Sequence, residues 1–158
     1  MSFKKQLEKI KEGIAEIHNL AVDKVLINYE GVLKQRIFND SGAENSNGGK
    51  LGAYKSESYK KKRASLGRSS GNINLNFSGE LERSIKLVNI EDDRALVVTS
   101  VNYVASKFYS KPSATTEDVS NYIDKNFNKV FEPTKEELED NNRQLDKIIE
   151  EEFNKLEK

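Results

Sequence analysis

The first 38 residues carry apolar side chains at helical spacing, which constrains the fold more than any other feature of the chain. Over residues 3–21 the spacing alternates between four and three, at Phe3, Leu7, Ile10, Ile14, Ile17 and Ala21. This is the a/d pattern of a helix with one narrow apolar stripe. The stripe changes phase near His18–Asp23, which predicts either a kink or a break with Asp23 as the N-cap of a second helix. We expect a long helical region over residues 1–38.

The rest of the chain offers little apolar material to cover such a helix. Of 158 residues, 35% are hydrophobic, below the roughly 45–50% of an average globular protein. One modest domain (residues 1–158) with a thin core and long exposed helices is expected, and part of its apolar surface needs a partner. There is no Cys, so disulfides and thiolate chemistry are excluded and the redox compartment is unconstrained.

Charge is zoned along the chain although the totals balance at 26 basic and 26 acidic residues. Residues 49–70 carry seven basic residues and one acidic residue, a net charge of +6, whereas residues 117–158 carry seven basic and 13 acidic residues, a net charge of −6. The two segments can meet within one molecule, or between subunits arranged head to tail in a ring or filament. Alternatively, both are solvated surfaces.

Residues 39–72 contain Gly, Ser and Asn clusters and then a basic stretch without apolar periodicity. A long segment of this kind is typical of a functional loop or of disorder, and we interpret it as a flexible basic arm. The arm supplies the candidate residues for contact with DNA or with a neighbouring subunit: Lys50, Lys55, Lys60, Lys61, Lys62, Arg63 and Arg68, with Tyr54 and Tyr59. The cations could neutralise phosphates while the rings stack on bases; the alternative is an ordinary exposed loop.

Residues 73–110 read as a short helix followed by a β-hairpin. Ser78 can accept hydrogen bonds from free backbone N–H groups at the start of the helix. Two runs rich in β-branched residues, 85–90 and 94–100, are joined by Glu91-Asp92-Asp93 and predict antiparallel strands.

Residues 115–158 predict two further helices. The first has an apolar face from Val119 to Phe131 and is ended by Pro133. Thr134 and Glu137 form a capping-box pattern before a final, highly charged helix. The order of long helix, extended polar and basic loop, short helix, hairpin or small sheet, and C-terminal helices indicates an α+β fold.

The residues that usually carry catalysis are scarce. The chain has one His, His18, and no phosphate-binding Gly-rich loop. The acidic pairs at Asp92-Asp93 and at 150–152 fall in a predicted turn and on a helix surface, where carboxylates are ordinary solubilising groups. We therefore expect no enzyme activity, no metal and no cofactor. No apolar run approaches the roughly 18 residues that span a bilayer, so no membrane partner and no secretory signal are expected.

Three stretches together resemble a signature of tailed-bacteriophage proteins: residues 49–54, residues 59–63 and, most specifically, residues 75–85, Leu-Asn-Phe-Ser-Gly-Glu-Leu-Glu-Arg-Ser-Ile. The signature belongs to the virion morphogenesis or tail-completion family, similar to Mu-like head–tail joining proteins. Val101-Asn102-Tyr103 after the hairpin and residues 130–137 before the last helix also look similar, so the resemblance covers roughly residues 50–158.

The resemblance implies a structural virion protein that joins head and tail, located in the virion and, during assembly, in the host cytoplasm. Its implied partners are further copies in a ring of about six or twelve subunits, other neck, portal or tail proteins, and DNA in the channel. The motif residues have a structural role in this interpretation: Phe77, Ser78, Gly79, Leu81, Ser84 and Ile85. A small DNA-binding module that uses the basic arm, and a helical adaptor that pairs through residues 3–21, are the alternatives.

Overall fold

The computed structural model describes residues 3–76, 79–90, 93–100 and 114–156 and is a mixed helix and sheet fold, as predicted. Its elements follow the predicted order, with one additional helix, α2. They are α1 (Phe3–Phe38), α2 (Glu57–Ser65), α3 (Glu80–Ser84), β1 (Ile85–Ile90), β2 (Asp93–Val98), α4 (Thr116–Phe127) and α5 (Lys135–Leu156).

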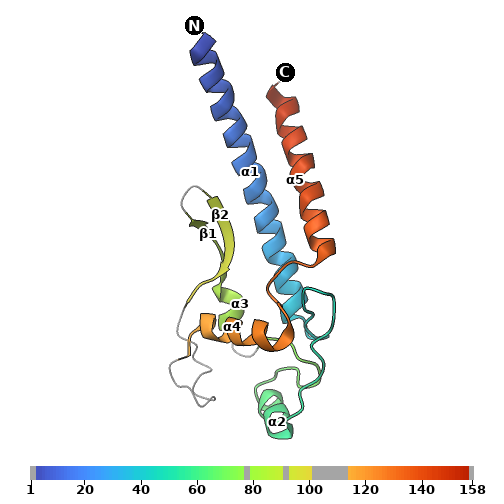
Figure 1. The fold of residues 1–158 in the computed structure, drawn as a ribbon. Helices are drawn as coiled ribbons and strands as arrows, with labels where there is room; N and C mark the ends of the chain where they lie inside the picture. Colours follow the sequence, from blue (N-terminus) through green and yellow to red (C-terminus); the bar gives the residue numbers. More distant parts are fainter. Residues whose placement is uncertain (1–2, 77–78, 91–92, 101–113, 157–158) are drawn as a thin grey trace.

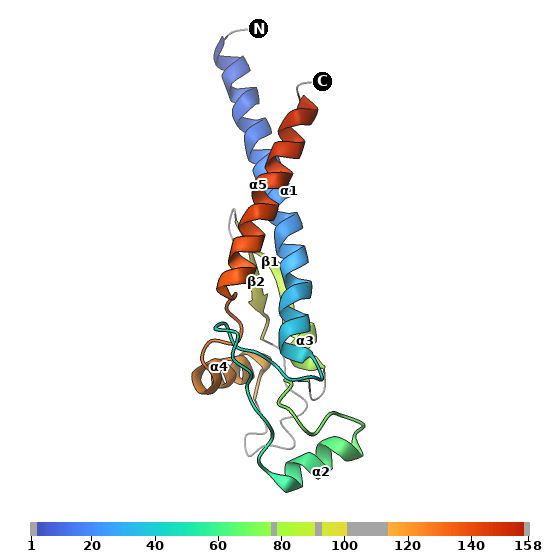
Figure 2. The ribbon, with the colours of Figure 1, turned by 90° about the vertical axis from the view of Figure 1, so that its right-hand side faces the viewer.

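Helices α1 and α5 lie side by side and antiparallel, so both ends of the chain lie at the same end of the molecule (Figures 1 and 2). Polar contacts tie them together: the Asn28 amide donates to Gln144 Oε1 at 2.8 Å, and Lys24 pairs with Glu152 at 3.2 Å. We call this two-helix unit the stalk. Helix α2 lies at the end of the molecule that is remote from the chain termini.

Helix α1 is continuous from Phe3 to Phe38, so a break near Asp23, one of the two predicted alternatives, does not occur. Asp23 does not begin a helix. Its Oδ2 forms an ion pair with Nη1 of Arg94, in β2, at 2.9 Å. Helix α1 packs against both α5 and the hairpin. The apolar stripe changes phase because α1 has these two packing partners along its length, and the backbone does not need to break.

The core forms where the C-terminal half of α1 meets α3, β1 and α4. Its buried members are Tyr29, Leu33, Ile37, Phe38, Ala43, Leu81, Ile85, Ile123 and Val130. The cluster is small for a chain of 158 residues, in line with the low apolar fraction. Most of the stalk lies beyond it.

Strands β1 and β2 form the predicted antiparallel hairpin, in a register that runs from Ile85 opposite Val98 to Ile90 opposite Asp93. Residues 91 and 92 of the predicted turn lie outside the described residues. Beyond the paired strands, the Thr99 N–H donates to the Ser84 carbonyl at 2.8 Å. The hairpin is thereby fixed to the end of α3.

The two C-terminal helices are confirmed, with one change of boundary. Helix α4 ends at Phe127 because Asn128 adopts a left-handed conformation (φ +61°) that closes the last turn, and Val130 is buried in the connection that follows. The predicted capping box of α5 is present: the Glu137 N–H donates to Thr134 Oγ1 at 3.1 Å, and the Thr134 N–H donates to Glu137 Oε2 at 2.8 Å.

Candidate functional site

The segment predicted as an extended flexible arm contains a helix that was not predicted, and its chain is hydrogen-bonded into a loop and not extended. Residues 57–65 form α2, with Ser56 as N-cap, and the flanking chain is held by backbone hydrogen bonds. The Ala43 N–H donates to the Ile73 carbonyl at 2.7 Å, and the Ile73 N–H donates to the Gly52 carbonyl at 2.8 Å. These bonds connect both ends of the loop next to the C-terminus of α1.

Arg63 is the centre of this loop and not a surface cation, since only 1% of it is exposed. Its Nε donates to the Ser69 carbonyl at 2.6 Å, and its Nη2 donates to the Asn76 carbonyl at 3.0 Å and to the side chain of Asn74. Asn74 in turn donates to Asp40 at 2.7 Å. A buried guanidinium needs such acceptors to offset its lost hydration, so Arg63 cross-links the loop.

Two tyrosines complete the Arg63 cluster. The guanidinium carbon lies 4.6 Å from the centre of the Tyr54 ring and 5.9 Å from that of Tyr59, within the range of cation–π attraction. The rings meet edge to face, with centres 5.2 Å apart, and the Tyr54 hydroxyl donates to the Asn74 carbonyl at 2.7 Å. The two rings therefore pack around Arg63, which is a structural use of residues that the sequence suggested for base stacking.

The remaining predicted basic residues lie nearer the surface. Lys55, Lys61 and Arg68 are exposed, and Lys62 is half-buried. Lys60 pairs with Glu57 at 2.7 Å, and Lys50 lies 3.9 Å from Glu44. The structure thus divides the predicted contact set into an internal cluster and a basic surface on and around α2, at the end remote from the stalk tip (Figure 1).

The basic helix α2 and the acidic helix α5 do not lie side by side (Figures 1 and 2). A contact within one molecule between these two helices is therefore excluded. The basic segment does lie beside α4, the other helix of the acidic segment, because Tyr54 and Arg63 line the same pocket as Asp118. Contact between subunits and plain solvation remain as further explanations of the charge zoning.

The motif element lies at the junction of the core. Leu81, Ser84 and Ile85 are all buried, and Ser84 Oγ donates to the Leu81 carbonyl at 2.7 Å. Gly79, not Ser78, is the N-cap of α3 and has a φ of +76°, a conformation that favours glycine. Phe77 and Ser78, and the Val101-Asn102-Tyr103 stretch, lie outside the described residues.

A cluster around Arg36 was not predicted, because one Arg in a charged helix carries no distinguishing signal. Arg36 Nε donates to Glu137 Oε1 at 2.7 Å, and its other nitrogens donate to the Glu44, Val130 and Glu132 carbonyls at 2.8–3.0 Å. Burial, together with the negative charge of Glu137, raises the pKa of the neighbouring Tyr29 to about 12, although the Arg36 guanidinium opposes the rise.

A pocket of about 670 Å³ lies between the loop and α4, with Tyr54, Leu75, Val119, Ile123 and Phe127 among its lining residues. Its walls are mainly aliphatic and aromatic. The cationic group that lines it, Arg63, is held by the acceptors described above. The carboxylate that lines the pocket, Asp118, accepts from the Thr115 N–H at 3.0 Å in the capping box of α4. Arg63 and Asp118 thus both have structural contacts.

Among the described residues, no three His, Cys, Asp or Glu side chains are grouped closely enough to hold a metal ion. Over the same residues, no helix combines the length and the apolar character needed to cross a lipid bilayer. Comparison of the chain with known protein families, with curated proteins and with solved structures found no match.

Proposed function

We propose that this chain is a structural protein of a tailed-bacteriophage particle, a subunit of the neck or tail-completion ring that joins the head to the tail. The observation that carries the proposal is the placement of the motif element. Residues 79–85, which resemble the family signature most closely, connect α3 to the hairpin and contribute Leu81 and Ile85 to the core. A structural motif that organises the fold is what a non-catalytic assembly subunit requires.

The stalk also supports an assembly role. Its helices expose large apolar side chains, among them Ile10 and Ile27 of α1 and Leu138 of α5. Scattered single apolar residues are normal on protein surfaces, but several along one helix pair favour a surface that is covered by another chain. This agrees with the low fraction of hydrophobic residues in the chain, because few apolar side chains are left to pack against the stalk within one molecule.

The basic surface around α2 would contact DNA in the channel or an acidic neighbour. A small DNA-binding module is the second candidate function, and the exposure of Lys55, Lys61 and Arg68 favours it. The two functions differ in what the isolated protein does: a DNA-binding module binds DNA as a monomer, with an affinity that falls steeply with salt, whereas a ring subunit self-associates.

Virion assembly without the protein tests the proposal. In the phage that encodes the chain, its loss should leave heads and tails that do not join, as seen by electron microscopy, and the wild-type chain supplied in trans should restore infectious particles. Joined, infectious particles in its absence would contradict the proposal.

The basic surface is tested in the same assay by reversing Lys55, Lys61 and Arg68 to Glu. Arg63 is kept, because its reversal would disrupt the folded loop. Restoration by this variant should be reduced in a salt-sensitive manner. Reversal of Lys125, an exposed lysine of α4, is the matched control and should restore particles normally.

A further inference from the structure

We infer that the free half of the stalk is an interface between two copies of this chain, in which the N-terminal part of α1 in one copy packs on the exposed apolar edge of α5 in the next. This inference rests on the proposed function in one respect, because it requires the protein to self-associate. It names the partner of the exposed stalk and the residues that meet.

The α1 side of this interface is an apolar stripe that lacks a cover at its N-terminal end. Leu7, Ile10 and Ile14 are 43%, 58% and 47% exposed. In the same stripe, one turn further along, Ile17 and Ala21 are buried. The C-terminal part of the stripe is therefore buried within the molecule, whereas its N-terminal part is exposed to solvent.

The α5 side is the apolar edge of an otherwise charged helix. Phe153, near the free end of α5, is 40% exposed. The neighbouring Glu152 pairs with Lys24 of α1, so Phe153 lies beside the contact between the two helices and stays partly open to solvent.

Charges beside the two apolar surfaces are complementary. On α1, Lys4 and Lys11 each lie one turn from Leu7. On α5, Glu150 lies one turn before Phe153, and Asp146 lies one turn before Glu150. None of these four charged groups is paired within the part of the chain that the structure describes. Such pairing would guide α1 of one copy to α5 of another.

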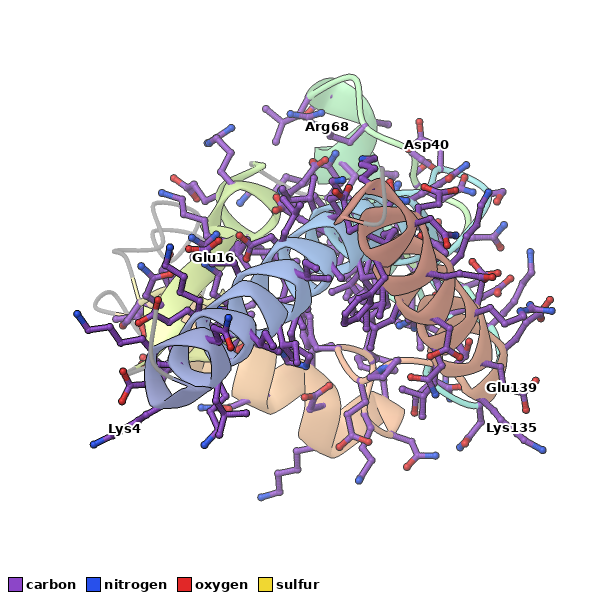
Figure 3. The ribbon with its side chains drawn as sticks, turned by 90° about the horizontal axis from the view of Figure 1, so that it is seen from above. Lys4, Glu16, Asp40, Arg68, Lys135 and Glu139 are labelled. Atoms are coloured by element: carbon purple, nitrogen blue, oxygen red, sulfur yellow. The ribbon has the colours of Figure 1, made fainter. Side chains whose placement is uncertain are left out.

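The geometry also fits a ring. The free ends of α1 and α5 lie at the same end of the molecule (Figures 1 and 2), so stalks packed side by side and parallel bring the two surfaces to the same height. Lys4 of α1 and Lys135 of α5 point outward on opposite sides of the molecule (Figure 3), so the two stalk helices present different surfaces. Contacts made by different surfaces on opposite sides are heterologous and can close into a ring.

Cysteine cross-linking of the full-length chain tests this contact, since the native sequence has no Cys. A Lys11→Cys variant and a Glu150→Cys variant, carrying different tags, are mixed and oxidised. We expect disulfide-linked heterodimers at about tenfold the yield of a control mixture of Lys61→Cys with Glu150→Cys, because Lys61 lies on α2 at the other end of the molecule. Equal yields from the two mixtures would overturn the inference.

Charge reversal gives an independent test by light scattering. The pairs Lys4→Glu with Lys11→Glu, and Asp146→Lys with Glu150→Lys, should each weaken self-association by about tenfold. A one-to-one mixture of the two variants should restore it, because every contact in the mixture again joins opposite charges. A wild-type protein that assembles while neither variant weakens it overturns the inference but leaves the proposed function standing. A wild type that never associates overturns both.

Discussion

The Nε of Arg36 donates to Oε1 of Glu137 at 2.7 Å and so joins the last turns of α1 to the first turn of α5. Both side chains are largely buried, and Glu137 also caps the backbone N–H of Thr134. This pair fixes the base of the stalk to the core. The stalk therefore projects at a defined angle, which an assembly surface on its free half requires.

Replacement of Arg36 by Met should lower the free energy of unfolding by about 3–5 kcal/mol, because it leaves the Glu137 carboxylate without its partner. Urea denaturation measures the loss. Lys135→Ala on the same turn of α5 breaks only the exposed pair with Glu139 and should change the stability by less than about 1 kcal/mol. Equal effects of the two substitutions would contradict the role given to Arg36.

Replacement of Arg63 by Ala should destabilise the protein by about 2–4 kcal/mol, because Asn74 and the Ser69 carbonyl lose a buried donor. Lys at this position should not rescue stability, since an ammonium cannot reproduce the planar, forked contacts. Limited proteolysis should then cut within residues 39–76. The exposed neighbour Lys61 is the control, and K61A should leave both readouts unchanged. A mobile basic arm would instead give R63A and K61A the same behaviour.

Tyr29→Phe should change the stability by less than about 1 kcal/mol near pH 7, because the buried hydroxyl forms no hydrogen bond of good geometry, although it interacts with the nearby Arg36 guanidinium. The difference in unfolding free energy between the wild type and the Phe variant should change at high pH. The folded-state pKa of Tyr29, about 12, exceeds the ordinary value of 10.0, so the unfolded chain ionises first. Wild-type stability should then fall as pH rises from about 10 to 12 relative to the Phe variant. Parallel stability curves for the two proteins over this range would refute the assignment.

Gly79→Ala should cost about 1–2 kcal/mol, because an L residue is strained at a φ of +76°. A Cβ there would also come within 2.8 Å of Arg83 Nη1, although that side chain can move aside. Gly71→Ala is the matched control, since a Cβ at that position meets open space. Thermal unfolding of both variants measures the difference, and an unaltered midpoint for G79A would show that α3 does not need its left-handed start.

Much of the fold could be predicted because local signals coincide with tertiary packing. The hairpin follows from its two β-branched runs, and the start of α5 follows from Thr134 and Glu137, whose capping contacts are made entirely within the first turn. The length of α1 was predicted, but its continuity through Asp23 was not. Helix α1 packs against both α5 and the hairpin, and Asp23 pairs with Arg94 of β2; no local pattern reveals these long-range partners.

The loop of residues 39–76 could not be predicted in the same way. Helix α2 has no apolar face, and its local signals are slight. Ser56 Oγ accepts from the Tyr59 N–H at 3.3 Å, and the first turn carries the acidic Glu57 and the last turn the basic Lys62. Its position depends on Arg63, whose acceptors come from residues 69–76. In the sequence, a run of basic residues predicts a solvent-exposed surface. The structure alone shows that Arg63 is the buried member of this run.

The mass of the purified full-length protein in solution, measured by light scattering over a range of protein and salt concentrations, tests the central claim most directly. The account predicts a discrete species at a multiple of 17.9 kDa, of about six or twelve subunits, with high salt weakening the charged contacts of the stalk. A strictly monomeric protein at every concentration and salt would contradict it.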